Sequence, residues 1–260
     1  MLSAVIITKN EEENIGRCLT SLAFADEIIV VDDGSTDKTC KIAADLGARV
    51  IQHPWAGFGV QKNIGLDAAT HDWVLCIDAD EEVSPDLAAE ITSTVMAAKY
   101  DVYWLPVLDF FLGKPMPHLQ GNNPRLLRTS KARWTNRAVH EQVTLTNTQG
   151  YIVRLGDTYS GVLTQPLFHH GHKTIRSYLT KMHRYTSLDA EQMATTNRHR
   201  SGRAVTPHIF LPLQLMIRQF IKLAFWRGGY KDGYPGLMWA ILSAYYEWEM
   251  AQKYRALHKK

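Results

Sequence analysis

The sequence is poor in cysteine and has no long apolar run. Its three cysteines, Cys18, Cys40 and Cys76, are widely spaced and form no C-x-x-C pair, so neither a disulfide framework nor a zinc ribbon is indicated. No uncharged apolar stretch is long enough to cross a bilayer, and residues 1–10 contain no basic leader followed by an apolar region. We therefore expect a cytoplasmic protein in a reducing compartment, without a membrane span.

Net charge is also small, but it is unevenly distributed. The 260 residues carry a formal charge of +3 and are 45% hydrophobic, which is enough for a substantial core. Residues 198–260 hold 11 Lys/Arg against 3 Asp/Glu, whereas the preceding 197 residues hold 18 against 23. This asymmetry predicts that the basic C-terminal end binds an anionic surface or an anionic partner.

The first hundred residues alternate between short β-branched runs and helical stretches, which is the pattern of parallel βαβ units. This predicts an α/β fold with a mainly parallel sheet flanked by helices. Ser35 is expected to cap the second helix and Gly47 to end it. The pattern becomes irregular over residues 102–162 and then helical again. Strands are expected at 2–8, 27–32, 48–52 and 73–77, and helices at 12–23, 35–46, 60–69, 85–99, 177–199, 206–227 and 237–257.

Two acidic clusters follow predicted strands. Asp78 and Asp80 come directly after the apolar run 73–77, and Asp32 and Asp33 end the strand at 27–32. Two carboxylates one residue apart at a strand end are suitable ligands for a Mg²⁺ or Mn²⁺ ion that also binds a phosphate. The alternative is an acidic turn that caps the next helix. In an open parallel sheet both clusters face the crevice at the carboxyl ends of the strands. We therefore expect one shared binding site there.

Three motifs together resemble those of family 2 glycosyltransferases of the GT-A fold. They are VIITKNE at residues 5–11, VDDGS at 31–35 and DADE at 78–81, in that order and spacing. Within the family, the chain is similar to lipopolysaccharide core β-1,4-glucosyltransferases. The resemblance implies a UDP-sugar donor, a Mn²⁺ or Mg²⁺ cofactor, inversion at the transferred sugar, and an inner-core heptose or similar lipid-linked glycan as acceptor.

The resemblance also implies a domain organisation. A GT-A catalytic domain would cover residues 1–175, with a nucleotide-sugar half at 1–100 and an acceptor and catalytic half at 101–175. Residues 176–260 would form a helical C-terminal extension that either lies at a membrane interface or forms oligomer contacts.

Nucleotide-binding roles follow position by position from the resemblance. Thr8 and Asn10 would line the nucleotide pocket, and Asp33 would contact the uracil. Lys62 stands where relatives often place Arg before Asn, so it would support the base or the diphosphate. The substitution keeps a cation but loses the planar fork of arginine.

A second set of residues would contact the diphosphate side of the donor. Asp78 would contact the ribose or a metal-bound water, and Asp80 would bind the metal. Relatives have a His before a similar aromatic-glycine element, so the resemblance makes His169 a further candidate for the metal or the diphosphate. No Cys or second His pair lies at a spacing that would favour a dedicated zinc site around it. Arg125 and Arg128 would neutralise phosphates of donor or acceptor, with solvation at a strand edge as the alternative.

An inverting transfer also needs a base on the face of the sugar opposite the departing diphosphate. Glu141, in a His-Glu pair after the irregular segment, is the candidate that the resemblance implies. The alternative is a surface glutamate paired with Arg137. The neighbouring His140 would orient the loop or contact substrate.

Three other functions fit the sequence less well. The run Gly57-Phe58-Gly59 imitates a dinucleotide-binding fingerprint, but Lys62 replaces its third glycine and residues 53–56 interrupt the required tight turn. A sugar-phosphate nucleotidyltransferase needs a glycine-rich basic loop after the first strand, whereas residues 9–13 are acidic and lack glycine. A non-catalytic module with a basic membrane- or nucleic-acid-binding tail is the third alternative, and we expect no nucleic-acid partner.

The C-terminal helix expected around residues 209–226 has a broad apolar face and a narrow polar stripe of Gln214, Arg218 and Lys222. Such a helix suits an anionic membrane interface, with Trp226 near the headgroups. This favours peripheral attachment at the cytoplasmic face of the inner membrane. The equally open alternative is a helix packed on the body or on a partner subunit of a homo-oligomer.

Overall fold

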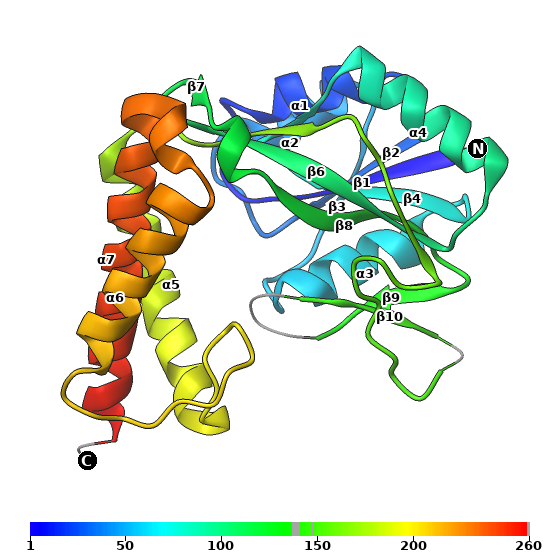
Figure 1. Ribbon diagram of the computed structural model, residues 1–260. Helices are drawn as coiled ribbons and strands as arrows, with labels where there is room; N and C mark the ends of the chain where they lie inside the picture. The colour runs from blue at the N-terminus through cyan, green and yellow to red at the C-terminus, as the bar shows by residue number, and fades with distance from the viewer. Residues whose placement is uncertain (137–140, 147, 259–260) are drawn as a thin grey trace. The chain divides into compact units, whose positions relative to one another are not determined.

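The computed structural model describes residues 1–136, 141–146 and 148–258 (Figure 1). The chain divides into two compact units, one of Met1–Leu108 with Gly121–His169 and one of Asp109–Gln120 with His170–Lys260. The domain boundary expected after residue 175 stays a prediction, and the two units are described separately.

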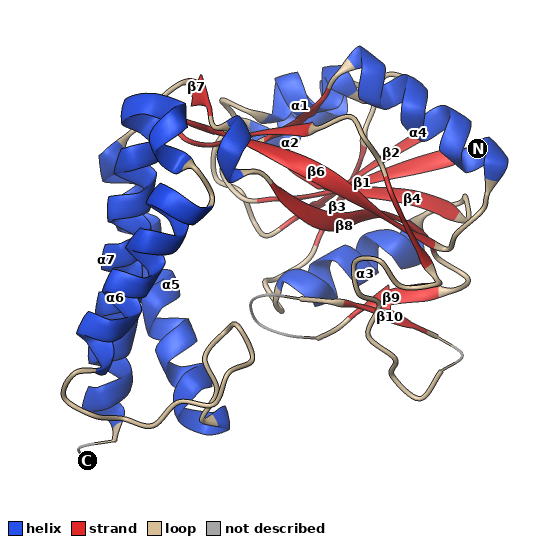
Figure 2. Ribbon diagram, in the orientation of Figure 1, coloured by secondary structure: helices blue, strands red, loops and turns tan. Residues whose placement is uncertain are grey.

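Four parallel strands form one side of the sheet in the first unit (Figure 2). Their register pairs Thr8 with Asp32 and Ile7 with Asp78, so three strands end at the same edge of the sheet. The prediction of a parallel sheet with both acidic clusters at one edge is thus confirmed. The strands lie in the order β3 (Arg49–Gln52), β2 (Glu27–Asp32), β1 (Leu2–Thr8) and β4 (Trp73–Asp78).

The sheet continues beyond β4 with antiparallel strands in the region that looked irregular in the sequence. Pro124 lies where the register of β6 and β8 shifts between Tyr103 and Trp104. A proline at a bulge breaks the alternation of apolar residues, which hid this pair of strands. The remaining strands are β8 (Gly121–Arg128), β6 (Val102–Phe111), β12 (Leu167–His172), β5 (Glu81–Val83) and β11 (Ser160–Val162), with β9 (Ala132–Trp134) and β10 (Val143–Leu145) forming a separate hairpin.

Helices cover both faces of the sheet because β1 is buried on both sides. Ala4 and Ile6 belong to the core under α1, α2 and α4, whereas Val5 and Ile7 belong to the core under α3 and the β9–β10 hairpin. A Cβ atom added to Gly65 would lie 2.2 Å from a methyl carbon of Val5, so glycine allows α3 to approach β1 closely. The helices are α1 (Ile15–Ser21), α2 (Thr39–Asp45), α3 (Phe58–Ala68) and α4 (Pro85–Ala97).

The predicted cap of α2 is wrong. The Ser35 side chain donates to Asp32 Oδ1 at 2.5 Å instead of capping a helix, and α2 begins only at Thr39. The predicted end of this helix is confirmed, because Gly47 follows it with a φ of +83°. The serine and its aspartate thus shape a loop at the carboxyl end of β2.

In the second unit α7 packs against both α5 and α6 (Figure 1). A capping box of Thr174 and Ser177 begins α5. The helix α7 starts before the predicted residue 237, because Pro235 lies in its first turn, where proline does not interrupt a helix. None of the helices in the described part of the chain is long and apolar enough to cross a membrane. The elements are β7 (Lys114–Pro115), η1 (Pro117–Leu119), α5 (Ile175–Thr196), α6 (Leu211–Ile221), the π-helical η2 (Lys222–Trp226), η3 (Gly229–Asp232) and α7 (Gly233–Leu257).

Candidate active site

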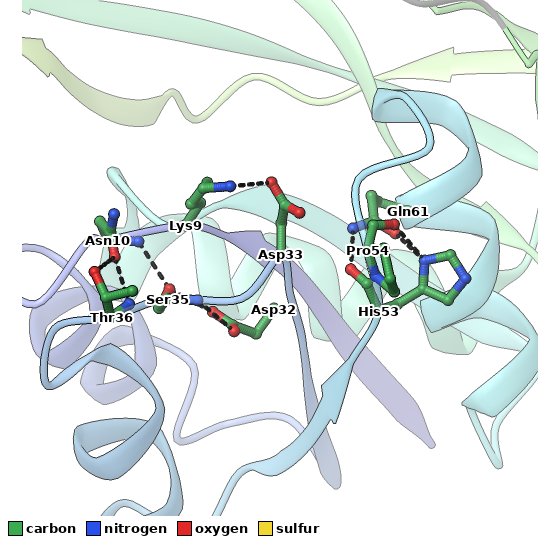
Figure 3. Close-up of polar contacts among 9 residues, drawn as sticks. All are labelled: Lys9, Asn10, Asp32, Asp33, Ser35, Thr36, His53, Pro54 and Gln61. Atoms are coloured by element: carbon green, nitrogen blue, oxygen red, sulfur yellow. Dashed lines mark hydrogen bonds and ion pairs between the residues drawn. The ribbon is translucent and has the colours of Figure 1, made fainter.

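The loops after β1 and β2 are joined by side chains predicted to bind a nucleotide (Figure 3). Asn10 has a left-handed φ of 53°; its backbone N–H donates to Ser35 Oγ at 2.8 Å, and its Oδ1 accepts from the backbone N–H of Thr36 at 2.8 Å. Lys9 Nζ lies 2.8 Å from Asp33 Oδ2. Asn10 therefore holds the loop that carries Asp33 in place.

One buried polar group near these loops is suited to a ligand, and a second side chain braces the neighbouring segment. The buried Oγ1 of Thr8 has no hydrogen-bond partner in the described part of the chain, and a buried hydroxyl without a partner is costly. At the start of α3, Gln61 Nε2 donates to the His53 carbonyl at 3.0 Å, which fixes the segment leading from β3 (Figure 3).

Asp78 is held by a buried arginine. Arg125 Nη2, from β8, donates to Asp78 Oδ2 at 2.9 Å, and the same nitrogen pairs with Glu81. Glu81 Oε2 in turn accepts from the backbone N–H of Asp78 at 2.8 Å. In the sequence Glu81 is only the last residue of the DADE motif, without a role of its own, but the structure buries it beneath Asp78. Alternation along the short strand β5 accounts for this burial, because it turns Glu81 inward and leaves Glu82 partly exposed.

Burial and charge separate the two carboxylates of this cluster. Burial alone would raise the pKa of Asp78, but the positive charges of Arg125 and Lys62 outweigh it and hold that pKa below its usual value. Burial raises the pKa of Glu81 above its usual value, although Arg125 opposes this. Asp78 therefore remains the ionised acceptor at the end of β4.

Lys62 brings the candidate base to this edge of the sheet. Its ammonium lies 2.5 Å from Glu141 Oε1 and 3.8 Å from Asp78 Oδ1, and the lysine side chain is only 4% exposed. The same nitrogen lies 4.6 Å from the centroid of the Trp134 ring. The Lys62 ammonium thus bridges Glu141 and Asp78 at the end of β4, although these two residues are 63 positions apart in the sequence.

The segment leading to Glu141 is fastened to α3. Asn63 Nδ2 donates to the Trp134 carbonyl at 2.9 Å, and Asn63 Oδ1 accepts from the Trp134 N–H at 3.0 Å. A Cβ atom on Gly59 would lie 1.9 Å from the carbonyl oxygen of Thr135 and 3.5 Å from Glu141 Cβ. No pattern in the sequence indicates that Asn63 and Gly59 support Glu141, and Gly59 belongs to the run that imitates a dinucleotide-binding fingerprint.

Replacing Gly59 by alanine is expected to lower turnover by about 10² if Glu141 is the base, because the clash with Thr135 must shift the backbone beside the candidate base and small misplacements of reacting groups are costly. Donor affinity should change much less. Steady-state turnover and calorimetric UDP binding measure the two effects. Gly16→Ala is the matched control, since its nearest neighbour would be Ile42 Cγ2 at 3.8 Å. Equal turnover in both variants would show that close packing at Gly59 does not position the base.

The two predicted metal ligands lie together. His169 Nε2, on β12, is 3.5 Å from Asp80 Oδ2, and β12 pairs with β5 so that His169 stands opposite Glu81. Over residues 1–136, 141–146 and 148–258, no three His, Cys, Asp or Glu side chains gather as a metal site. Two protein ligands fit Mg²⁺ or Mn²⁺, because these ions commonly complete their shells with substrate phosphates and water.

Some predicted residues lie elsewhere or outside the described chain. The structure does not bring Arg128 to this edge, since it stands opposite Trp73 at the start of β4 and lies 3.5 Å from both Asp72 and Asp101. His140 and Arg137 lie outside the described residues, so the alternative that pairs Glu141 with Arg137 stays untested.

Comparison with known proteins identifies the family. The model of Glycosyl transferase family 2 matches residues 3–147. The chain belongs to this family. The helix-flanked α/β sheet, with its C-terminal helices, is the GT-A architecture predicted for this family 2 transferase.

Individual relatives of this family 2 transferase cover most of its length. An uncharacterized glycosyltransferase of Rickettsia felis is 30% identical over 258 residues, spanning 94% of this chain and 86% of the relative. The lipopolysaccharide core biosynthesis glycosyltransferase LpsC of Rhizobium meliloti is 29% identical over 256 residues, spanning 94% and 90%. Crystalline glucosyl-3-phosphoglycerate synthase from Mycobacterium tuberculosis, in complex with Mn²⁺, UDP and glucosyl-3-phosphoglycerate, is similar over 43% of this chain and 44% of its own, with 28% identity and a TM-score of 0.36.

Proposed function

We propose that this family 2 transferase moves a hexose, with glucose as the first candidate, from a UDP-sugar to an inner-core heptose of lipopolysaccharide or a similar lipid-linked glycan, with inversion. The observation that carries this proposal is Lys62, which joins Glu141 to Asp78 at one edge of the sheet. The similarity to LpsC supports the class of acceptor. Family membership also favours sugar transfer over the nucleotidyltransferase alternative.

Donor binding would use the loops after β1 and β2. Asp33 keeps one carboxylate oxygen on Lys9 and can accept from the uracil N–H with the other. The buried Oγ1 of Thr8, which has no partner in the described chain, would bond the nucleotide. Asn10 would act by holding this loop in place. Asp78, kept ionised by Arg125, would accept from a ribose hydroxyl or from metal-bound water.

Asp80 and His169 would hold the divalent cation. Mg²⁺ or Mn²⁺ bound there would neutralise the negative charge of the leaving diphosphate. The buried guanidinium of Arg125 is already engaged by Asp78 and Glu81. We therefore propose that Arg125 acts on the donor through Asp78, as a positioning residue.

Glu141 would act as the base. The acceptor hydroxyl oxygen forms a bond to the anomeric carbon of the donor, the bond from that carbon to the diphosphate oxygen breaks on the opposite face, and the hydroxyl proton passes to a Glu141 oxygen. Lys62 would orient this carboxylate from its buried side. The second carboxylate oxygen of Glu141 would then accept the proton of the acceptor hydroxyl.

Location follows from the proposed acceptor. A lipid-linked glycan is reached at a membrane surface, so we propose that the protein attaches peripherally to the cytoplasmic face of the inner membrane. Packing of the C-terminal helices on a partner subunit of a homo-oligomer remains the alternative.

A donor-hydrolysis screen tests the proposed reaction. UDP-, GDP-, ADP- and dTDP-hexoses are incubated with the full chain and Mn²⁺, and the released nucleoside diphosphate is measured. We expect UDP-glucose to be hydrolysed fastest and chelation of the metal to stop the reaction. Faster release from another nucleotide sugar would reject the UDP assignment, and release that survives chelation would reject the metal. Loss of a hexose from lipopolysaccharide in a deletion strain, detected by mass spectrometry, tests the acceptor.

Replacing Asp80 by asparagine should remove the metal-dependent part of UDP binding. The expected loss of affinity in Mn²⁺ is more than about tenfold, the lower bound seen even for residues that only support metal ligands. Calorimetry with and without Mn²⁺ measures it. Asp86→Asn, in the first turn of α4, is the matched control. Undiminished UDP affinity in Mn²⁺ would sink the assignment of Asp80 as a ligand.

A further inference from the structure

The C-terminal segment hides its carboxylates. Residues 198–258 contain three acidic side chains, Asp232, Glu247 and Glu249, whose exposed fractions are 1%, 3% and 11%. Each is paired within the second unit. The partners are His118 for Asp232 at 2.6 Å, His199 and Arg200 for Glu247 at 2.9 and 2.6 Å, and His183 and Lys253 for Glu249 at 2.9 and 2.7 Å. The outward surface of this described segment therefore carries cations but no exposed carboxylate.

Apolar side chains lie exposed along one face of α6. They recur at intervals of three or four residues, which places them on one side of a helix, and exposed Arg218 and Lys222 border them. The turn Lys222–Trp226 is π-helical. In this turn Leu223 and Ala224 are buried, whereas Phe225 and Trp226 are exposed to solvent. The exposed apolar residues of this stretch are Phe210, Leu213, Ile217, Ile221, Phe225 and Trp226.

Exposed apolar residues also lie in the segment after α6 and along α7. The rings of Phe225 and Tyr230 have centroids 6.5 Å apart, and the exposed cations Arg227 and Lys231 lie within the same turn. Along α7 the exposed residues again recur at intervals of three or four: Tyr234, Leu237, Ile241 and Tyr245. We call the exposed apolar residues of α6, the turn and α7, with their four bordering cations, the aromatic-basic face.

We propose that the aromatic-basic face docks on the surface of an anionic phospholipid leaflet. Aromatic side chains with a polar edge favour the level of lipid headgroups, and exposed lysine and arginine complement anionic lipid. Hiding all three carboxylates removes the charges that such a surface would repel. An interface with a second copy of the same face fits less well, because it would bring the four bordering cations of both copies together without an exposed carboxylate from residues 198–258.

This inference deepens the proposed function, because docking would bring the active site to a lipid-linked acceptor. The donor reaction itself does not require it. Hydrolysis of a water-soluble UDP-sugar and binding to vesicles are therefore separate measurements. Absent hydrolysis with intact vesicle binding would reject the proposed function and leave the docking surface standing.

Cosedimentation of the full chain with vesicles tests the proposal. We expect binding to phosphatidylcholine vesicles that contain phosphatidylglycerol, much weaker binding to phosphatidylcholine alone, and release at high salt. Replacing both Arg218 and Lys222 by serine should weaken binding to the anionic vesicles by a factor of about five per cation. Lys99→Ser with Lys131→Ser is the matched control, since both of these lysines are exposed in the first unit.

The aromatic contribution is tested by replacing both Phe225 and Trp226 with serine. Its control is Met96→Ser, because Met96 and Trp226 are each 76% exposed. Vesicle binding should fall more than tenfold in the aromatic variant and stay unchanged in the control, with hydrolysis of soluble UDP-sugar unchanged in both. Unchanged vesicle binding in the aromatic and the cation variants would overturn the proposal. So would a lipid-free dimer, seen by light scattering, that these variants dissociate.

Discussion

Glu141→Gln is expected to lower turnover by at least about 10² while leaving UDP affinity in Mn²⁺ nearly unchanged. Glutamine retains an oxygen that can accept from Lys62, which lies 2.5 Å from Glu141 Oε1, so the local geometry should survive. It has no basic carboxylate to take the proton of the acceptor hydroxyl. Turnover measured against acceptor concentration, with UDP binding measured separately by calorimetry, distinguishes a lost base from a lost binding site.

Two further variants separate catalysis from packing. Glu90→Gln replaces a glutamate whose carboxylate accepts from the backbone N–H of Thr164 and Gln165, and it should leave turnover unchanged. Lys62→Met removes the partner of Glu141 but keeps the carboxylate. If Glu141 served only to pair with Lys62, the lysine variant would lose as much turnover as Glu141→Gln. Near-normal turnover in Glu141→Gln would place the base elsewhere.

The parallel half of the sheet could be predicted from the sequence because its strands are short, continuous apolar runs bounded by polar loops. Leu2–Thr8 and Glu27–Asp32 begin and end where the sequence predicts. Runs of this kind fit strands buried on both faces. Their carboxyl ends must then share an edge, and this places Asp33 and Asp78 together without any knowledge of long-range contacts.

The other side of the site could not be predicted in this way, because it depends on pairings between distant residues. Lys62 and Glu141 are 79 positions apart, and Arg125 and Glu81 are 44 apart. No local periodicity indicates either pair. Glu81 also looked like an ordinary acidic residue before a helix, since its inward orientation depends on pairing of β5 with β12.

Glu141 and Arg125 were candidate site residues from the sequence, but the sequence could not say what each contacts. The structure gives Arg125 two carboxylate partners within the protein. Contact between Arg125 and a phosphate of the donor stays a prediction. The buried pairing of Arg125 nevertheless gives a sharp expectation for stability, which the sequence alone did not.

Arg125→Met should lower the free energy of unfolding by about 3–5 kcal/mol, because it leaves Glu81 buried without its cation and deprives Asp78 of its nearest positive charge. Denaturant unfolding measures this loss. Arg128→Met is the control in the same strand, since Arg128 is 31% exposed and lies 3.5 Å from each of two aspartates, and such pairs contribute at most about 1 kcal/mol.

Adding Glu81→Gln to Arg125→Met should recover part of the lost stability, because the side chain left in the buried site is then neutral. UDP affinity in Mn²⁺ should remain low in this double variant if Arg125 acts by holding Asp78. Equal stability losses for Arg125→Met and Arg128→Met would contradict the buried-pair account. Since Arg128 lies at the opposite end of β4 from Asp78, a loss of donor affinity confined to Arg125→Met would also assign the two predicted arginines different roles.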